Sequence, residues 1–237
     1  VLCIMQRCQE QDERYILSYD MTECYYDSFS YEREDIYFAD GWKSGEIFGS
    51  IWRRANAVYE DDRLKLYIDH DYESSAQKWS SAEYVTQQFC RYGVYEVCMK
   101  PIAVEGAISA FFTYTCPGFG EKAVWDEIDI EFLGNDTTKV QFNYYTNGVG
   151  KHEYLYDLGF DAADSFHTYG FIWEKETITW TVDGLAVYSV HGKIPSRPSR
   201  MMLNTWVTHG LPNWAGEFSG EVPICAEYEW VRYKREN

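Results

Sequence analysis

Three carboxylates spaced two residues apart stand in the middle of the chain, a pattern that could carry acid–base or nucleophilic chemistry. The segment 125–132 reads Trp-Asp-Glu-Ile-Asp-Ile-Glu-Phe. In a strand, alternation places Glu127, Asp129 and Glu131 on one face beside Trp125, and the apolar residues on the other. Like charges at neighbouring same-face positions destabilise a strand. Three acids with no basic residue among them therefore indicate a functional face.

Glycoside hydrolysis would use such a row of acids. The reaction needs two carboxyl groups beside the scissile bond, one protonated to donate and one ionised to attack or to activate water. Crowding keeps one carboxyl protonated near neutral pH and couples the titrations. The Cα atoms of Glu127 and Glu131 lie ~13 Å apart in a regular strand, at ~3.3 Å per residue. Both side chains must lean inward to reach the ~5–5.5 Å of a retaining enzyme, so the spacing permits retention without excluding inversion.

Two plainer interpretations of the acids stay open. They could bind a hard cation such as calcium, although adjacent acids on one strand make a poor cage and no Asp-x-Asp-x-Asp-Gly loop is present. The face could also simply be solvated. Other catalytic chemistry has no matching pattern: the five histidines form no His-Glu-x-x-His set, no Gly-x-Ser-x-Gly exists, and the seven cysteines include no Cys-x-x-Cys.

Composition favours a neutral carbohydrate as the partner. The chain has 38 acidic and 21 basic residues, a formal charge of −17, which disfavours nucleic acid, anionic membranes and polyanionic polysaccharides. It also has 21 Tyr, 13 Phe and 9 Trp. Tyrosine and tryptophan combine an apolar ring with a polar handle, which suits a wet groove that holds sugar rings. No apolar run approaches the ~18 residues of a transmembrane helix.

The elements that must position the acids read as short strands separated by turns, which is typical of an all-β sandwich or barrel. The clearest hairpin has strands at 177–182 and 185–190 around Asp183-Gly184, a strong turn pair. Asn147-Gly148 is a second such pair and follows a strand predicted at 140–145. Further strands are expected at 64–68 and 93–99, and no amphipathic helix of convincing length appears after residue 25.

The first 24 residues read differently from the rest. We expect 1–24 to be an N-terminal extension of unknown role, ahead of a single catalytic domain at 25–237. Cys3, Cys8 and Cys24 crowd into this segment, where a local disulfide could form, and an odd cysteine count leaves at least one unpaired in a monomer. The chain starts at Val1 without a signal peptide. We expect a processed, secreted (extracellular) protein.

Residues 125–134 resemble the active-site signature of glycoside hydrolase family 16, in its bacterial lichenase (endo-1,3-1,4-β-glucanase) branch. Laminarinases of the family usually insert one residue before the last glutamate, and this chain does not. The resemblance extends over about residues 26–237. It is carried by segments that follow the order found in lichenases, at 92–97, 111–115, 139–148, 166–169 and 226–230.

The resemblance implies a jelly-roll β-sandwich of two curved antiparallel sheets with an open substrate cleft on the concave face. It implies endo-acting, retaining hydrolysis of β-1,4 bonds in mixed-linkage β-1,3-1,4-glucan, with Glu127 as nucleophile, Glu131 as general acid/base and Asp129 tuning both. The chemistry needs no cofactor, and we expect a monomer acting on a neutral β-glucan. The substrate contacts carried over by matching position are Glu83, Phe112, Tyr114, Trp125, Asn143, Tyr145, Asn204 and Trp206.

The chain departs from the family pattern at three places. Val85 stands where many lichenases carry an arginine, so one substrate contact is missing. Ser50 and Ser81 correspond to two cysteines that form a disulfide in relatives. The positions of the usual structural calcium site are Ser28, Asp62 and Glu229, which do not match the common pattern, so a structural calcium is left open and no metal ligand is carried over.

Two other functions remain open beside the hydrolase. A xyloglucan endotransglycosylase/hydrolase has a signature that also resembles residues 126–135, although the segments 139–148 and 166–169 are more similar to lichenases. A non-catalytic β-glucan-binding module would need the aromatic groove but not Glu127 and Glu131 together.

Overall fold

The computed structural model describes residues 21–74, 76, 78–115 and 125–235, and in this part of the chain the fold is all-β. The first eight strands are β1 (Cys24–Asp27), β2 (Ile36–Phe38), β3 (Ser50–Trp52), β4 (Ala57–Glu60), β5 (Arg63–His70), β6 (Trp79–Thr86), β7 (Gly93–Lys100) and β8 (Ala107–Tyr114). The others are β9 (Glu127–Leu133), β10 (Lys139–Tyr145), β11 (Tyr154–Asp157), β12 (His167–Trp173), β13 (Thr177–Val182), β14 (Leu185–His191), β15 (Arg200–Val207) and β16 (Ile224–Lys234). One turn of 3-10 helix, η1 (Arg54–Asn56), precedes β4.

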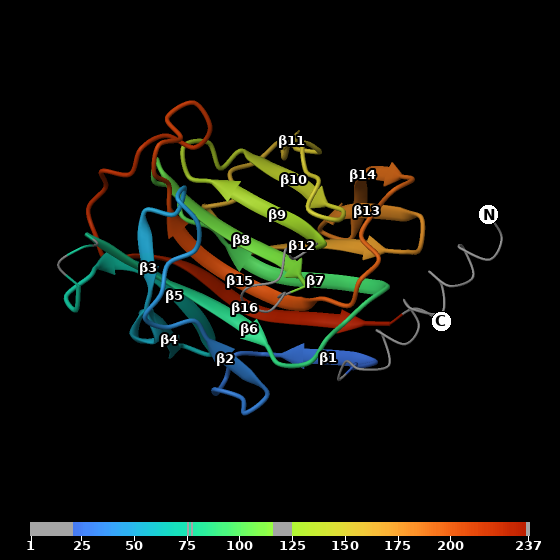
Figure 1. Ribbon diagram of the computed structural model, residues 1–237, viewed down its shortest axis with the longest axis horizontal. Coiled ribbons are helices and arrows are strands. Elements are labelled where there is room, and N and C mark those ends of the chain that lie inside the picture. The colour runs from blue at the N-terminus through green and yellow to red at the C-terminus, as the bar shows by residue number, and fades with distance from the viewer. Residues whose placement is uncertain (1–20, 75, 77, 116–124, 236–237) are drawn as a thin grey trace.

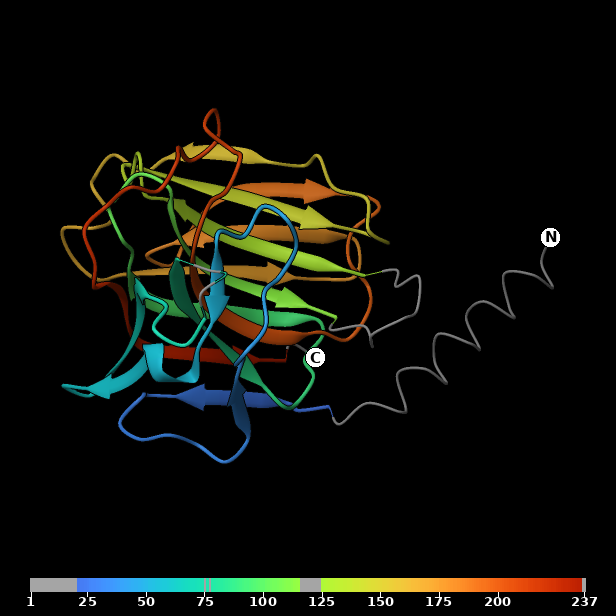
Figure 2. The same cartoon turned by 60° about the vertical axis from the view of Figure 1, so that its left-hand side comes forward.

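The strands form two antiparallel sheets that join along one edge. Hydrogen bonding follows the path β11-β10-β9-β8-β15-β6-β5-β16-β7-β12-β13-β14, and Figure 1 shows β10, β9, β8 and β15 side by side. The sheets meet where β5 pairs with β6, through only two residue pairs. Strand β3 adds to β6 in parallel. Blue β1 runs beside red β16 in Figure 2, so the two ends of the described chain are paired.

The predicted alternation of core residues is confirmed in the two strands that matter most for the site. Ile128, Ile130 and Phe132 of β9 are fully buried, as are Ile178 and Trp180 of β13. Burying an aliphatic or aromatic side chain contributes about 1.5–3 kcal/mol, so each strand is anchored by one apolar face.

The two sheets also meet through a hydrogen bond beneath the acidic strand. The indole of Trp180 donates from Nε1 to the backbone carbonyl of Asp129 at 3.1 Å, and the same ring stacks on Phe142 of β10 at a centroid distance of 5.4 Å. A buried tryptophan N–H needs such an acceptor. The acidic strand β9 is therefore supported from below by the opposite sheet.

Both predicted Asx-Gly turns are present with left-handed backbone. Asp183 and Gly184 have φ of 48° and 76°, and Asn147 and Gly148 have φ of 55° and 73°. Positive φ at both central residues is the geometry of a two-residue hairpin turn whose twist matches the flanking strands. The second turn links β10 to the segment that leads into β11.

The sequence departures in the framework have clear structural counterparts. Ser50 and Ser81, the positions of the relatives' disulfide, are buried and lie side by side, with their Oγ atoms 2.8 Å apart. Cys24, Cys90, Cys98 and Cys225 are free thiols. Residues 1–20, and with them Cys3, Cys8 and most of the predicted 1–24 extension, lie outside the described residues, while Cys24 begins β1. No helix among the described residues is long and apolar enough to span a membrane.

Candidate active site

The three predicted carboxylates share the face of β9 that points away from the core, and we call the same face of β6, β15, β8, β9 and β10 the active face. Strand β9 lies between β8 and β10. Asp129 is 5% exposed, and Glu127 and Glu131 are partly exposed. The register sets predicted contacts directly across from the acids: Tyr114 and Tyr145 lie opposite Glu127, and Phe112 and Asn143 lie opposite Asp129.

A second predicted pair lies in the same cross-strand row as Glu131. Asn204 on β15 is opposite Ala110, which is in turn opposite Glu131. The Nδ2 of Asn204 donates to the Glu83 carboxylate at 3.1 Å, and both side chains are buried. Burial raises the pKa of Glu83 to about 7, against the lowering effect of this hydrogen bond. The row thus places the Asn204 amide two strands and the Glu83 carboxyl three strands away from β9, where both can bind hydroxyl groups.

The two predicted tryptophans occupy different positions. The indole Nε1 of Trp125 donates to the Glu127 carboxylate at 3.1 Å, and its ring lies tilted against Tyr145 with a centroid distance of 6.0 Å. Trp206 is only 4% exposed, because Phe48 packs on it at 4.2 Å and Trp214 at 5.9 Å. Trp125 therefore contacts Glu127 directly, whereas Trp206 packs against other rings.

The pKa values of the three acids on β9 are raised, mainly because the carboxyl groups are buried. Burial, together with the charge of Glu131, raises the pKa of Glu127 to about 8. Burial raises the pKa of Glu131 to about 7, while a hydrogen bond from Gln141 lowers it. Burial and the neighbouring glutamates also raise the pKa of Asp129. Because the titrations are coupled, the group as a whole retains protons near neutral pH.

The hydrogen bonds distinguish the two glutamates. The Glu127 carboxylate accepts from Trp125, and a hydrogen bond with the Asp129 carboxyl lowers the pKa of Glu127 while raising that of Asp129. A protonated Asp129 that donates to an ionised Glu127 accounts for both directions. Glu131 accepts only from Gln141 in the described structure. The arrangement can hold one ionised and one protonated glutamate side by side.

Two functional residues were not predicted. Gln141 lies directly opposite Glu131 on β10 and donates from Nε2 to its carboxylate at 2.8 Å. Trp214 donates from Nε1 to the Gln141 carbonyl oxygen at 2.9 Å. The alternation that places Asn143 and Tyr145 on the active face also places Gln141 there, so this signal could have found it. No local pattern marks Trp214.

The missing arginine leaves an apolar patch on the active face. Val85 is 1% exposed and packs with Ala110, Phe112 and Met202. Its neighbour on β2 is Tyr37, whose hydroxyl accepts a hydrogen bond from Arg200 at 3.2 Å. The Arg200 guanidinium also lies 4.7 Å from the ring centroid of Phe89. Arg200, which comes from β15, therefore reaches Tyr37, the residue paired with Val85.

The positions matched to the calcium site do not form a carboxylate cluster. Glu229 forms an ion pair with Arg63 at 3.3 Å and accepts a hydrogen bond from the Cys98 thiol at 3.4 Å. Across the described ranges, no group of three or more His, Cys, Asp or Glu side chains is placed to hold a metal ion.

Comparison with known proteins places the chain in a family. The sequence pattern described as "Glycosyl hydrolases family 16" matches residues 45–232. A beta-glucanase of Paenibacillus macerans is 48% identical over 196 residues, which are 82% of this chain and 81% of the relative.

Two solved structures are similar over almost the whole described fold. A prokaryotic beta-1,3-1,4-glucanase (lichenase) from a mouse hindgut metagenome has a TM-score of 0.87 at 46% identity, covering 91% of this chain and 100% of that one. Bacillus licheniformis beta-glucanase has a TM-score of 0.85 at 43% identity, covering 91% and 99%. The predicted jelly-roll of curved antiparallel sheets is confirmed by these matches. The chain belongs to glycosyl hydrolase family 16.

Proposed function

We propose that the protein is an endo-acting β-1,3-1,4-glucanase that hydrolyses β-1,4 bonds in mixed-linkage β-glucan with retention of configuration. The observation that carries the proposal is the acidic row of β9, where Glu127 and Glu131 share one face and differ in their hydrogen bonds. Relatives at 43–48% identity that are named beta-glucanase or lichenase support the substrate class.

In the first step the Glu127 carboxylate attacks the anomeric carbon of the glucose unit that it faces. The bond from that carbon to the bridging oxygen breaks, and Glu131 gives its proton to the leaving oxygen. In the second step Glu131 takes a proton from water, the water oxygen bonds to the anomeric carbon, and Glu127 leaves as carboxylate. Glu131, with a pKa of about 7, can both donate and accept a proton near neutral pH.

In this scheme the reactive form has Glu127 ionised and Glu131 protonated, and the hydrogen bond from a protonated Asp129 favours that form against the burial that raises the pKa of Glu127 to about 8. A carboxyl that stays protonated next to Glu127 donates a hydrogen bond instead of adding a repelling charge. The remaining contacts bind the glucan chain: aromatic rings stack on sugar faces, while Asn143, Asn204 and Glu83 hydrogen-bond hydroxyl groups.

Azide rescue tests the two glutamate roles. Glu127→Ala should abolish hydrolysis of barley β-glucan, by about 10⁴-fold or more, because no covalent intermediate forms. With azide and a glycoside that has an activated leaving group, this variant should yield the glycosyl azide of inverted configuration. Glu131→Ala with azide should yield the retained product, because azide then attacks the covalent intermediate. The opposite pairing of variant and product would reverse the roles.

The same preparation decides between the hydrolase and its rivals. Wild-type protein should release short oligosaccharides with new reducing ends from barley β-glucan. Binding without reducing ends would identify a β-glucan-binding module instead. Transfer between xyloglucan chains, with barley β-glucan left intact, would identify a xyloglucan endotransglycosylase/hydrolase.

A further inference from the structure

The Asn147–Gly148 turn touches the site although neither residue belongs to the acidic row. The backbone N–H of Gly148 donates to the Trp125 carbonyl at 2.7 Å. A Cβ atom at Gly148 would lie 2.9 Å from a ring carbon of Trp125, closer than real Cβ atoms come to other atoms. The glycine is therefore required both by its positive φ and by the indole that packs directly against it.

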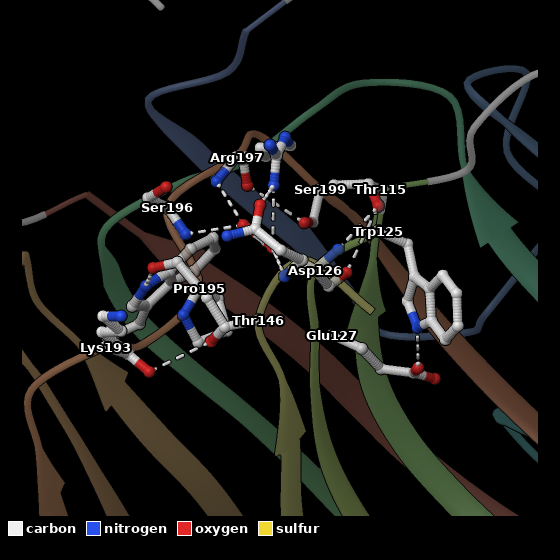
Figure 3. A network of polar contacts seen from close by, with 12 residues as sticks. Thr115, Trp125, Asp126, Glu127, Thr146, Lys193, Pro195, Ser196, Arg197 and Ser199 are labelled. Atoms are coloured by element: carbon white, nitrogen blue, oxygen red, sulfur yellow. Dashed lines mark hydrogen bonds and ion pairs between the residues drawn. The ribbon is translucent and has the colours of Figure 1, made fainter. Parts of the chain in front are cut away.

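The buried carboxylate of Asp126 holds this turn, and Figure 3 shows its contacts with Ser196 and Arg197. Asp126 is fully buried, and its Oδ1 accepts from the backbone N–H of Asn147 at 2.8 Å and from the Arg197 guanidinium at 3.1 Å. Its Oδ2 accepts from the backbone N–H groups of Ser196 at 2.8 Å and Arg197 at 2.9 Å. Arg197 also donates to the Asn147 side chain at 2.5 Å. Such a fully satisfied network fixes the turn relative to the start of β9.

The turn is linked to Glu127, the proposed nucleophile, through Trp125. Trp125 is held at its carbonyl and its ring by Gly148, and its indole N–H reaches the Glu127 carboxylate at 3.1 Å. We propose that the Asn147–Gly148 turn, clamped by Asp126 and Arg197, is a positioning element that holds the Trp125 indole on Glu127. The inference rests on the proposed role of Glu127 as nucleophile. It makes Gly148, Asp126 and Arg197 positioning residues that act through Trp125.

The chain offers a matched control for this element. Gly184 occupies the same place in the other Asx-Gly turn, with φ of 76° against 73° for Gly148. A Cβ atom at Gly184 meets nothing within 4 Å, whereas one at Gly148 meets the Trp125 ring. Alanine at either position therefore adds a similar backbone strain, and only Gly148→Ala displaces the indole.

Kinetics of the two alanine variants test the proposal. Gly148→Ala should lower kcat/KM on barley β-glucan about 10- to 100-fold, the worth of one hydrogen bond to a charged group. Its loss should lie mainly in kcat. The Trp125 hydrogen bond lowers the pKa of Glu127, and Glu127 must be ionised to attack. The optimum of the pH profile should therefore move to higher pH in Gly148→Ala. Gly184→Ala should keep the wild-type kcat and pH profile while losing a similar amount of Tm.

A second variant and a second readout keep the test decisive. Arg197→Met leaves the three backbone donors to Asp126 and should move the pH optimum in the same direction by less, with Arg197→Lys closer to wild type. In wild-type protein the Trp125 indole N–H resonance should titrate with Glu127, and this response should be lost in Gly148→Ala. An unchanged pH optimum and an unchanged indole response in both Gly148→Ala and Arg197→Met overturn the proposal.

The indole readout does not depend on turnover. A wild-type protein that releases no reducing ends defeats the proposed function, while the resonance still reports whether the turn holds Trp125 on Glu127. The two failures are therefore distinguishable.

Discussion

Glu131, the proposed general acid, accepts a hydrogen bond from a glutamine whose orientation is fixed by a tryptophan. The indole N–H of Trp214 can only donate, so the oxygen of the Gln141 amide must face it at 2.9 Å. The amide NH₂ group is thereby turned toward the Glu131 carboxylate, at 2.8 Å. This donor stabilises the ionised form of Glu131 and opposes the effect of burial, so that the pKa of Glu131 is held at about 7.

Removing the amide should shift the pH dependence of catalysis. In Gln141→Leu the pKa of Glu131 should rise further, because only burial and the neighbouring charge of Glu153 remain. Glu131 must be protonated in the first step, so the pH optimum of kcat/KM should move to higher pH as the pKa of Glu131 rises, by about one unit for a lost hydrogen bond to a charged group. Rates measured from pH 5 to pH 9 check this. Trp214→Phe should give a smaller shift of the same sign, and an optimum that moves to lower pH would contradict the assigned donor.

At the scale of single residues, the sequence predicted the side chains whose positions follow from strand alternation, and it missed those in irregular segments. Glu127, Asp129 and Glu131 share a face because alternation is a property of any strand, and the structure places them so. Trp214 lies in the irregular segment between β15 and β16, where no period indicates which side chain turns toward β10. The coverage of Trp206 by Phe48 likewise depends on how a distant loop packs.

At the scale of elements, the prediction was best for strands with one apolar and one wet face. The hairpin of β13 and β14 and its Asp183–Gly184 turn were predicted from alternation and turn chemistry, and they are confirmed. Strand β6 was not predicted. All eight of its residues are buried, including Ser80, Ser81 and Glu83. A strand covered on both faces, with polar groups that find buried partners, shows no alternation in its sequence.

The junction of β3 and β6 should accept the disulfide of the relatives. Ser50 and Ser81 have their Oγ atoms 2.8 Å apart and are 31 residues apart in sequence. The double variant Ser50→Cys/Ser81→Cys should close a loop worth about 3–4 kcal/mol in unfolded-state entropy. At roughly 2–4 °C for each kcal/mol in a domain of this size, we expect Tm to rise by about 6–16 °C.

Calorimetry with and without reductant measures this gain. The rise should disappear when the disulfide is reduced, and neither single variant should respond to reductant. A double variant with wild-type Tm under oxidising conditions would show that the two strands cannot adopt disulfide geometry.

At the scale of the whole molecule, the acidic row of β9 and Glu83 on β6 lower the free energy of unfolding. Glu83, Glu127, Asp129 and Glu131 all have a pKa raised mainly by burial. A buried carboxyl with a raised pKa binds its proton more tightly in the folded chain than in the unfolded chain, so it opposes folding once both states are ionised. The net charge of −17 adds to this self-repulsion. The same crowding that suits glycoside cleavage therefore lowers stability at neutral and alkaline pH.

Neutralising one member of the row should stabilise the protein in a defined pH window. The pKa of Glu127 rises from 4.5 to about 8 on folding. Its favourable contribution is complete below pH 4.5 and is lost as the pH rises through about 8. Glu127→Gln cannot ionise, so its free energy of unfolding should equal that of the wild type near pH 4.5 and exceed it increasingly up to pH 8. Urea unfolding at pH 4.5, 6 and 8 measures the difference.

Exposed Glu221 provides the control for net charge. Glu221→Gln removes the same formal charge, but its effect on the free energy of unfolding should stay within about 0.5 kcal/mol, as for most surface substitutions. A gain in Glu127→Gln that matched this control, or that was largest at pH 4.5, would mean that burial of the acidic row is not what opposes folding. A gain that grows from pH 4.5 to pH 8 would show that the chain gives up stability to keep carboxyl groups protonated where the glucan is cut.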